Sequence, residues 1–213
     1  MKNCKWLLLL GVFLSYFISP YLPITWGWEN SLLEWLQIAI LTLGLILNCR
    51  WWREAKSVNQ FSTARFFAWA TLLWLLIIGR ELSWGRVFYP SGFDSVNGPS
   101  FLTMAQVPYG PLVHPLLAVI FVVLLYVIIK YALYKIPYEL LKKGQFPVTE
   151  LTITVLALAV ADLGEHKLHI PSMEEFDECI AYLGLILTSY SVKTALQKEH
   201  ESSESRVSQG IVP

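Results

Sequence analysis

The stretch LVHPLLAVIFVVLLYVIIKYALY, Leu112 to Tyr134, consists almost entirely of apolar residues. A helix of about 20 apolar residues can cross the hydrocarbon core of a membrane, because its backbone amides bond to one another within the helix. The whole chain of 213 residues has the same character, with 55% hydrophobic residues, 14% aromatic residues and a mean hydropathy of +0.50. This composition is typical of an integral membrane protein.

Six apolar runs predict six membrane-spanning helices, of which the fourth is the cleanest and the fifth is the shortest. The predicted fold is therefore an all-α, polytopic membrane helix bundle that occupies residues 1–196. The polar residues 197–213 predict a disordered cytoplasmic tail. The predicted spans are residues 6–24, 32–49, 66–84, 112–134, 150–165 and 176–196.

The first run also resembles a signal peptide, because Lys2 and Lys5 precede a short apolar core. The residues that follow it, SPYLPITWGW, contain no cleavage site of the A-x-A type. We therefore expect an uncleaved first span. Removal of this run would leave five spans with the same asymmetry of charge.

Lysine and arginine residues collect in alternate connections between the predicted spans. In the six-span arrangement, the segments on one side hold thirteen of these residues, and the opposite connections hold three, Arg80, Arg86 and Lys167. Basic residues accumulate on the cytoplasmic side of membrane proteins. Both termini are therefore expected in the cytoplasm.

Charge and cysteine content exclude several classes of function. Sixteen basic and sixteen acidic residues give a net charge of zero, and no nucleic-acid-binding motif is present, so the expected partners are membrane lipids and not nucleic acid. Cys4, Cys49 and Cys179 are widely separated and form no CxxC motif. Neither a disulfide framework nor a cysteine zinc site is expected.

Ionisable residues gather where the predicted spans meet the outer face. Glu81, in GRELSWGR, ends the third span, where a carboxylate opposes the helix dipole and needs a cationic partner. Glu178 lies one turn inside the sixth span, where helix capping does not explain it. We predict that Glu81 and Glu178 handle protons in catalysis, together with His114 at the start of the fourth span. A packed or capping role is the alternative for His114.

The same GRELSWGR segment supplies candidates for substrate binding. Arg80 and Arg86 are suited to an anionic headgroup or a phosphate, and Ser83 lies between them in the sequence. The alternative is a structural ion pair at the membrane interface, in which Arg80 or Arg86 is the partner of Glu81.

The segment DLGEHKLH, residues 162–169, has the spacing of a metal site. At about 100° per residue, its acids and histidines lie on one face of a helix. Carboxylate and imidazole ligands on adjacent turns suit zinc, iron or manganese. We predict a divalent metal bound by Asp162, His166 and His169. A buried polar cluster and a solvated helix end are the alternatives.

Two pairs of residues have the spacing of a helix capping box. They are Ser31 with Glu34 and Ser172 with Glu175. In the second segment, Glu174 and Asp177 also complement the positive end of the helix dipole. These acids are therefore expected to stabilise the starts of helices without a catalytic role.

GRELSWGR resembles the GEEISWGQR-like motif of a group of bacterial multi-spanning inner-membrane proteins. Those proteins also have an EWL segment, a later histidine and a late EE helix, which LLEWLQ, PLVHPL and MEEFDE match here. Arg80 replaces the first acid of the motif, and Arg86 stands where the motif has glutamine. The resemblance implies a bacterial inner-membrane helical protein and no particular activity. It singles out Glu81, Ser83, Trp84, His114 and Glu175.

Three functions are compatible with these features. The first is a metal-dependent enzyme that acts on a lipid or a lipid-linked substrate, in which the metal activates a bound water. The second is a small proton- or cation-coupled transporter, in which the acids and histidines form the ion path. The third is a non-catalytic membrane scaffold or assembly factor, in which the polar cluster holds the outer helix ends together.

Overall fold

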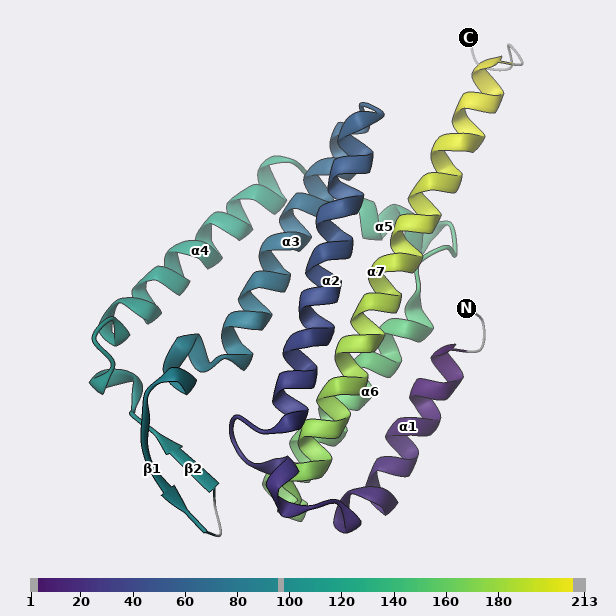
Figure 1. The fold of residues 1–213 in the computed structure, drawn as a ribbon. Coiled ribbons are helices and arrows are strands. Elements are labelled where there is room, and N and C mark those ends of the chain that lie inside the picture. The colour runs from purple at the N-terminus through teal and green to yellow at the C-terminus, as the bar shows by residue number, and fades with distance from the viewer. Residues whose placement is uncertain (1–3, 96–97, 209–213) are drawn as a thin grey trace.

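The computed structural model describes residues 4–95 and 98–208, which form a bundle of long helices with a small β-hairpin at one end (Figure 1). The helices are α1 (Cys4–Ile18), α2 (Leu32–Ser57), α3 (Phe61–Glu81), α4 (Gly110–Lys130), α5 (Lys135–Lys142), α6 (Val148–Leu163) and α7 (Pro171–Ser208). The strands β1 (Pro90–Asp94) and β2 (Gly98–Phe101) form the hairpin. Short 3₁₀ turns cover Ser19–Tyr21, Ile24–Gly27, Ser83–Phe88 and Met104–Gln106, and a π-helical turn covers Gly164–Leu168.

Five of the described helices are long and apolar enough to cross a membrane. They cover Cys4–Tyr21, Leu32–Ser57, Phe61–Glu81, Gly110–Lys130 and Pro171–Ser202. The protein is therefore a multi-pass integral membrane protein, and the prediction of an all-α membrane helix bundle is confirmed.

The fifth predicted span corresponds to α6, which has 16 residues. At 1.5 Å per residue its length is about 24 Å, which is less than the hydrocarbon core of a membrane. It nevertheless packs along α7. Gly164, near the end of α6, lies against the backbone of Glu174, and Thr154, nearer its start, lies against Gly184, so the two helices are antiparallel. The π-helical turn extends α6 at its end.

The packing of the helices separates α4 from the rest of the bundle (Figure 1). In the view of Figure 1, α2 lies between α3 and α7, and α4 lies on the side of α3 that is remote from α7. Leu41 of α2, Trp74 of α3 and Tyr182 of α7 form a buried apolar layer. Gly44 allows the Trp74 ring to lie directly against α2.

A second apolar cluster joins α1 and α6 to α7. Val12 of α1 and Ala157 of α6 pack against Ile180 and Ala181 of α7. Gly11 faces the side chain of Ile180. Because α1 and α7 run in opposite directions, later residues of α1 face earlier residues of α7 (Figure 1).

The end of α3 turns sharply at Ser83, Trp84 and Gly85, whose φ angles are 44°, 55° and 88°. Such left-handed conformations are rare for residues other than glycine, and they interrupt the helical path of the chain here. The Trp84 ring folds back onto Gly79, and the Tyr109 hydroxyl donates a hydrogen bond of 3.1 Å to the Trp84 carbonyl. The turn therefore directs the chain from α3 into the hairpin.

The C-terminal part of α7 differs from the sequence prediction. A disordered tail is predicted from residue 197, but α7 continues to Ser208 and extends beyond the other helices (Figure 1). Lys, Glu and Gln are good helix formers, which is consistent with continuation of the helix into this polar segment. The remainder of the predicted tail, residues 209–213, lies outside the described residues.

Candidate functional site

Glu81 and Glu178 are brought together by a single arginine. Arg80 donates through Nη1 to Glu81 Oε1 at 2.9 Å and through Nη2 to Glu178 Oε1 at 3.0 Å. The two carboxylate side chains are only 6% and 10% exposed, whereas the Arg80 side chain is 60% exposed. The cationic partner expected for Glu81 is therefore Arg80, which also joins α3 to α7.

Tyr182 completes this network from the next turn of α7. Its hydroxyl donates to Glu81 Oε1 at 2.6 Å and lies 3.0 Å from Arg80 Nη1. Short hydrogen bonds to a carboxylate are among the stronger polar contacts in proteins. Glu81 thus receives two donors in a buried position, which compensates for much of the cost of burying it.

A second connection joins α2 to α7 through Gln37 and Glu175. The Gln37 side chain is fully buried, and its Nε2 donates to Glu175 Oε2 at 2.8 Å and to the Glu175 carbonyl at 3.0 Å. Gln37 Oε1 has no hydrogen-bond partner among the described residues. The only partner of the Glu175 carboxylate in these contacts is a neutral amide.

Glu34 lies at the start of α2, close to the same group. Ser31 accepts a hydrogen bond from the Glu34 backbone, and the Glu34 carboxylate accepts one from the Asn30 backbone. The predicted capping role of Ser31 is therefore confirmed. Glu34 also lies near enough to Glu81 and Glu178 to repel their negative charges.

Together these residues form what we call the acid cluster. Its five carboxylates come from the start of α2, the end of α3 and the start of α7, and they interact electrostatically with one another. Its members are Glu34, Glu81, Glu174, Glu175 and Glu178.

Reasoning from the residues assigned Glu175 to helix capping, although the motif resemblance singles it out, and it missed Tyr182 and Gln37. Residues 175, 178 and 182 are spaced by three and four, so they lie on one face of α7. The same spacing relates Glu34 to Gln37 on α2. Extension of this periodicity from Glu178 is the signal that could have found them.

The predicted capping box at Ser172 is wrong. The helix α7 begins at Pro171, so Ser172 lies inside the helix and is not its N-cap. Its hydroxyl donates instead to the Ser19 carbonyl at 3.0 Å. The Glu175 carboxylate accepts a hydrogen bond from Gln37, and Asp177 is fully buried. Neither acid fits the description of a solvated helix start.

The other predicted substrate-binding residues lie beside the acid cluster. Arg86 forms an ion pair with Glu29, and its guanidinium lies 5.9 Å from the centre of the Phe101 ring. Ser83 Oγ is 3.5 Å from Arg86 Nη2. Arg80 and Arg86 are thus both paired with carboxylates, which reduces their capacity to bind a phosphate.

The predicted metal ligands are exposed at the end of α6. His166 Nδ1 lies 3.0 Å from Glu165 Oε2 and 3.7 Å from Asp162 Oδ1. His169 follows the π-helical turn in a left-handed conformation with φ 55°, so it does not continue the helical face. Within residues 4–95 and 98–208, no group of three or more His, Cys, Asp or Glu side chains is arranged to hold a metal ion. The metal site remains a prediction.

His114, the third predicted catalytic residue, is exposed near the start of α4. Because α4 lies beyond α3 from α7 in Figure 1, the structure does not bring His114 into the network of Glu81 and Glu178. The three residues therefore do not form one catalytic group in this conformation.

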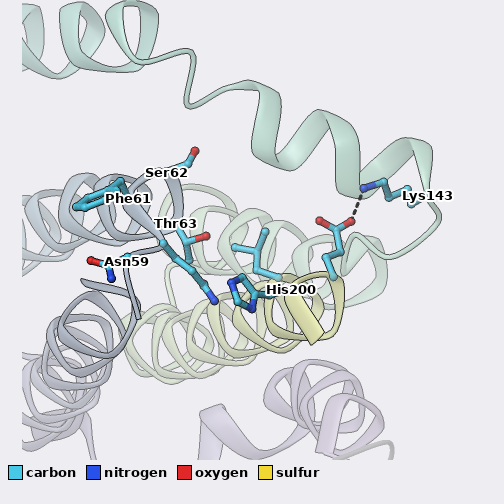
Figure 2. A pocket seen from close by; sticks show the side chains of 9 residues that line it. Asn59, Phe61, Ser62, Thr63, Lys143 and His200 are labelled. Atoms are coloured by element: carbon cyan, nitrogen blue, oxygen red, sulfur yellow. Dashed lines mark hydrogen bonds and ion pairs between the residues drawn. The ribbon is translucent and has the colours of Figure 1, made fainter. Parts of the chain in front are cut away.

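The opposite end of the bundle contains an open pocket of about 520 Å³. Figure 2 shows that its lining comes from the turn between α2 and α3, the segment after α5 and the end of α7. Lys143 and Glu199 form an ion pair of 2.6 Å at its edge, and this hydrogen bond raises the pKa of Lys143. None of the predicted site residues lines this pocket.

The fold and the site define a multi-pass helical membrane protein with a carboxylate-rich network at one end of the bundle. No family model, curated protein or solved structure matches the chain. The resemblance of GRELSWGR to the bacterial membrane-protein motif therefore remains a prediction.

Proposed function

We propose that the protein is a small proton transporter of the bacterial inner membrane, with the acid cluster on the periplasmic side as the site of proton binding. The observation that carries the proposal is the balance of charge in the cluster. Five carboxylates from three helices interact electrostatically, and the one guanidinium that contacts them, that of Arg80, pairs with only two, Glu81 and Glu178.

Repulsion between carboxylates makes full ionisation of the cluster unfavourable. Two unit charges 4 Å apart repel by about 4 kcal/mol at the effective dielectric constant typical of such sites. Carboxylates that share a site therefore hold protons in common, and the group takes up and releases them as a unit. Glu175 is the best-placed acceptor of a proton, because its partner is the neutral amide of Gln37.

The same geometry offers a way to couple a proton to movement of the helices. Arg80 joins α3 to α7 through its contact with Glu178. A proton taken up by the acid cluster lowers the negative charge that attracts Arg80 and weakens this connection. If a proton binds one arrangement of α3 and α7 more tightly than another, its binding shifts the population towards the first arrangement. Transport requires such a shift between two arrangements of the helices.

Flux measurements in liposomes test this proposal. The purified protein is reconstituted with a pH-sensitive dye inside the vesicles, and a potassium gradient with valinomycin imposes a membrane potential. We expect proton entry above that of empty liposomes, and we expect its loss in Glu175→Gln and Glu178→Gln.

Glu139→Gln is the matched control, because Glu139 is an exposed glutamate of α5, at the opposite end of the bundle from the acid cluster. Its flux should equal that of the unmodified protein. Flux no greater than that of empty liposomes, or flux that persists in both Glu175→Gln and Glu178→Gln, would remove the proposal.

A further inference from the structure

Asp177 is a buried acid that the acid cluster does not use. Its side chain is fully buried, and both carboxylate oxygens lack a hydrogen-bond partner in the described part of the chain. It precedes Ile180 and Ala181 by three and four residues, so it lies on the face of α7 that packs against α1. The ion-paired residue Glu178 instead faces Arg80 of α3.

The group that faces Asp177 from α1 is the hydroxyl of Ser15, which is itself fully buried. Ser15 has one hydroxyl hydrogen, and it donates that hydrogen to the Val12 carbonyl at 2.8 Å. What Ser15 presents to Asp177 is therefore a lone pair. An ionised carboxylate also presents only lone pairs, so the two groups would meet as acceptors.

No charged group compensates Asp177 from the elements packed around it. Within the described residues, α1 contributes Ser15, and the following 3₁₀ turn contributes Ser19, whose hydroxyl also lacks a partner. Ser172 of α7 is fixed to the Ser19 carbonyl. From α6, the buried residue that packs against this face of α7 is Ala157.

An ionised carboxylate without a cation or donor is very unfavourable in such a place. Its isolated burial costs far more than ordinary hydrogen bonds return, and the group neutralises instead. A proton on Asp177 removes the charge and gives one of its oxygens a hydrogen to donate towards the free lone pair of Ser15. Protonation thus removes the buried negative charge and also the repulsion between the lone pairs of Asp177 and Ser15.

We propose that Asp177 is a second proton-binding site, whose proton is donated to Ser15 and joins α1 to α7. The site is independent of the proposed function, because Asp177 belongs to a different face of α7 and to a different pair of helices. A sodium ion is the competing ligand, since it would also bridge the oxygens of Asp177, Ser15 and Ser19.

Infrared spectroscopy of the purified full-length protein at pH 7 provides the test. A protonated carboxyl has a carbonyl stretching band that an ionised carboxylate lacks. We expect Asp177→Asn to lose the part of this band contributed by one carboxyl group. Asp94→Asn, which removes an exposed aspartate of β1, should leave the band unchanged. An identical band in the unmodified protein and in Asp177→Asn would overturn the proposal.

Labelling with dicyclohexylcarbodiimide gives a second readout on the unmodified chain, so the proposal stays testable if Asp177→Asn does not fold. The O–H of a protonated carboxyl adds across a C=N bond of this apolar reagent, and rearrangement to the N-acylurea keeps all atoms. We expect mass spectrometry to find the adduct on Asp177 equally in sodium chloride and in choline chloride. Protection by sodium alone, or no adduct at Asp177, would overturn proton binding. Loss of proton flux in Glu175→Gln has no bearing on either result.

Discussion

Arg80 Nη2 lies 3.0 Å from Glu178 Oε1, and this contact connects the end of α3 to the first turns of α7. Arg80 is adjacent to Glu81 in the sequence and also contacts its carboxylate. One guanidinium therefore pairs with carboxylates of two helices. Arg80 therefore contributes directly to the stability of this end of the bundle.

Replacement of Arg80 by alanine is expected to destabilise the protein by about 2 kcal/mol. The change leaves Glu81 and Glu178 buried without a cation, which typically costs about 3–5 kcal/mol for a fully buried pair. The exposure of Arg80, 60% of its side chain, reduces this value through solvent screening. Thermal unfolding in detergent measures the effect as a lower Tm.

Arg50→Ala is the control for this prediction. Arg50 pairs with Glu54 one turn later on α2, and both side chains are largely exposed at 74% and 42%. Such pairs contribute about 0.3–0.5 kcal/mol, so the Tm should hardly change. Equal losses in Arg80→Ala and Arg50→Ala would show that the network around Arg80 is not stabilising.

Gly44→Ala is expected to weaken the contact between α2 and α3. A methyl group at this position would lie 2.4 Å from Trp74 Cζ3, and the Trp74 ring is buried and cannot move aside. Insertion of a methyl group into a packed core costs about 1–3 kcal/mol. A lower Tm of the variant in detergent checks this.

Gly11→Ala is the matched substitution on α1. There the added methyl group would lie 3.0 Å from Ile180 Cδ1, the end of a flexible side chain, so only a small adjustment is needed. Alanine also favours a helix over glycine by up to about 1 kcal/mol. We expect the Tm of Gly11→Ala to stay the same or rise, and a drop as large as that of Gly44→Ala would contradict the packing argument.

The helices of this fold can be predicted from the sequence because the hydrocarbon core of a membrane offers no hydrogen-bond partners to the backbone. Each apolar run must satisfy its backbone hydrogen bonds internally, so the run at residues 112–134 predicts α4 without knowledge of its neighbours. The pairing of Glu81 with Arg80 was also predictable, since the two are adjacent in sequence and the acid ends a helix.

Contacts between distant helices were not predictable in the same way. That Gln37 reaches Glu175 depends on how α2 packs against α7, and periodicity gives only the face of each helix. The spacing of Ser172 and Glu175 predicts an N-cap at Ser172, and this places Asp177 in the first turn of the helix as a capping acid. Proline is favoured at the first position of a helix, and Pro171 was therefore the available signal that the helix begins earlier.

Cysteine labelling is expected to show that α6 crosses the membrane despite its 16 residues. Gln145 precedes α6, and His166 follows it, and both side chains are exposed. Because α6 runs antiparallel along α7, Gln145→Cys and His166→Cys should react with a membrane-impermeant maleimide from opposite sides. The background protein carries Ala in place of Cys4, Cys49 and Cys179.

Orientation controls come from two serines at known ends of the bundle. Ser91 lies in β1 and Ser62 lies in the first turn of α3. In intact cells, Ser91→Cys and His166→Cys should be labelled together, while Ser62→Cys and Gln145→Cys should react only after permeabilisation. Labelling of Gln145→Cys together with His166→Cys would mean that α6 does not cross.

The turn after α3 is expected to show coupling between Gly85 and Tyr109. Gly85 has a φ of 88°, so alanine there costs about 1–2 kcal/mol from backbone strain alone. The added methyl group would also lie 2.4 Å from the Tyr109 hydroxyl oxygen. Tyr109→Phe removes the hydrogen bond to the Trp84 carbonyl and should cost about 1 kcal/mol.

The double variant separates the two effects. Phenylalanine at position 109 lacks the oxygen that the methyl group added by Gly85→Ala would meet. Only the backbone strain of Gly85→Ala then remains. The double variant should therefore lose less stability than the sum of the single variants, by about 0.5 kcal/mol or more. Thermal unfolding of the four proteins completes the cycle, with proteolysis of the β1–β2 hairpin as a local readout. Strict additivity would show that the Tyr109 hydroxyl does not hold this turn against α4.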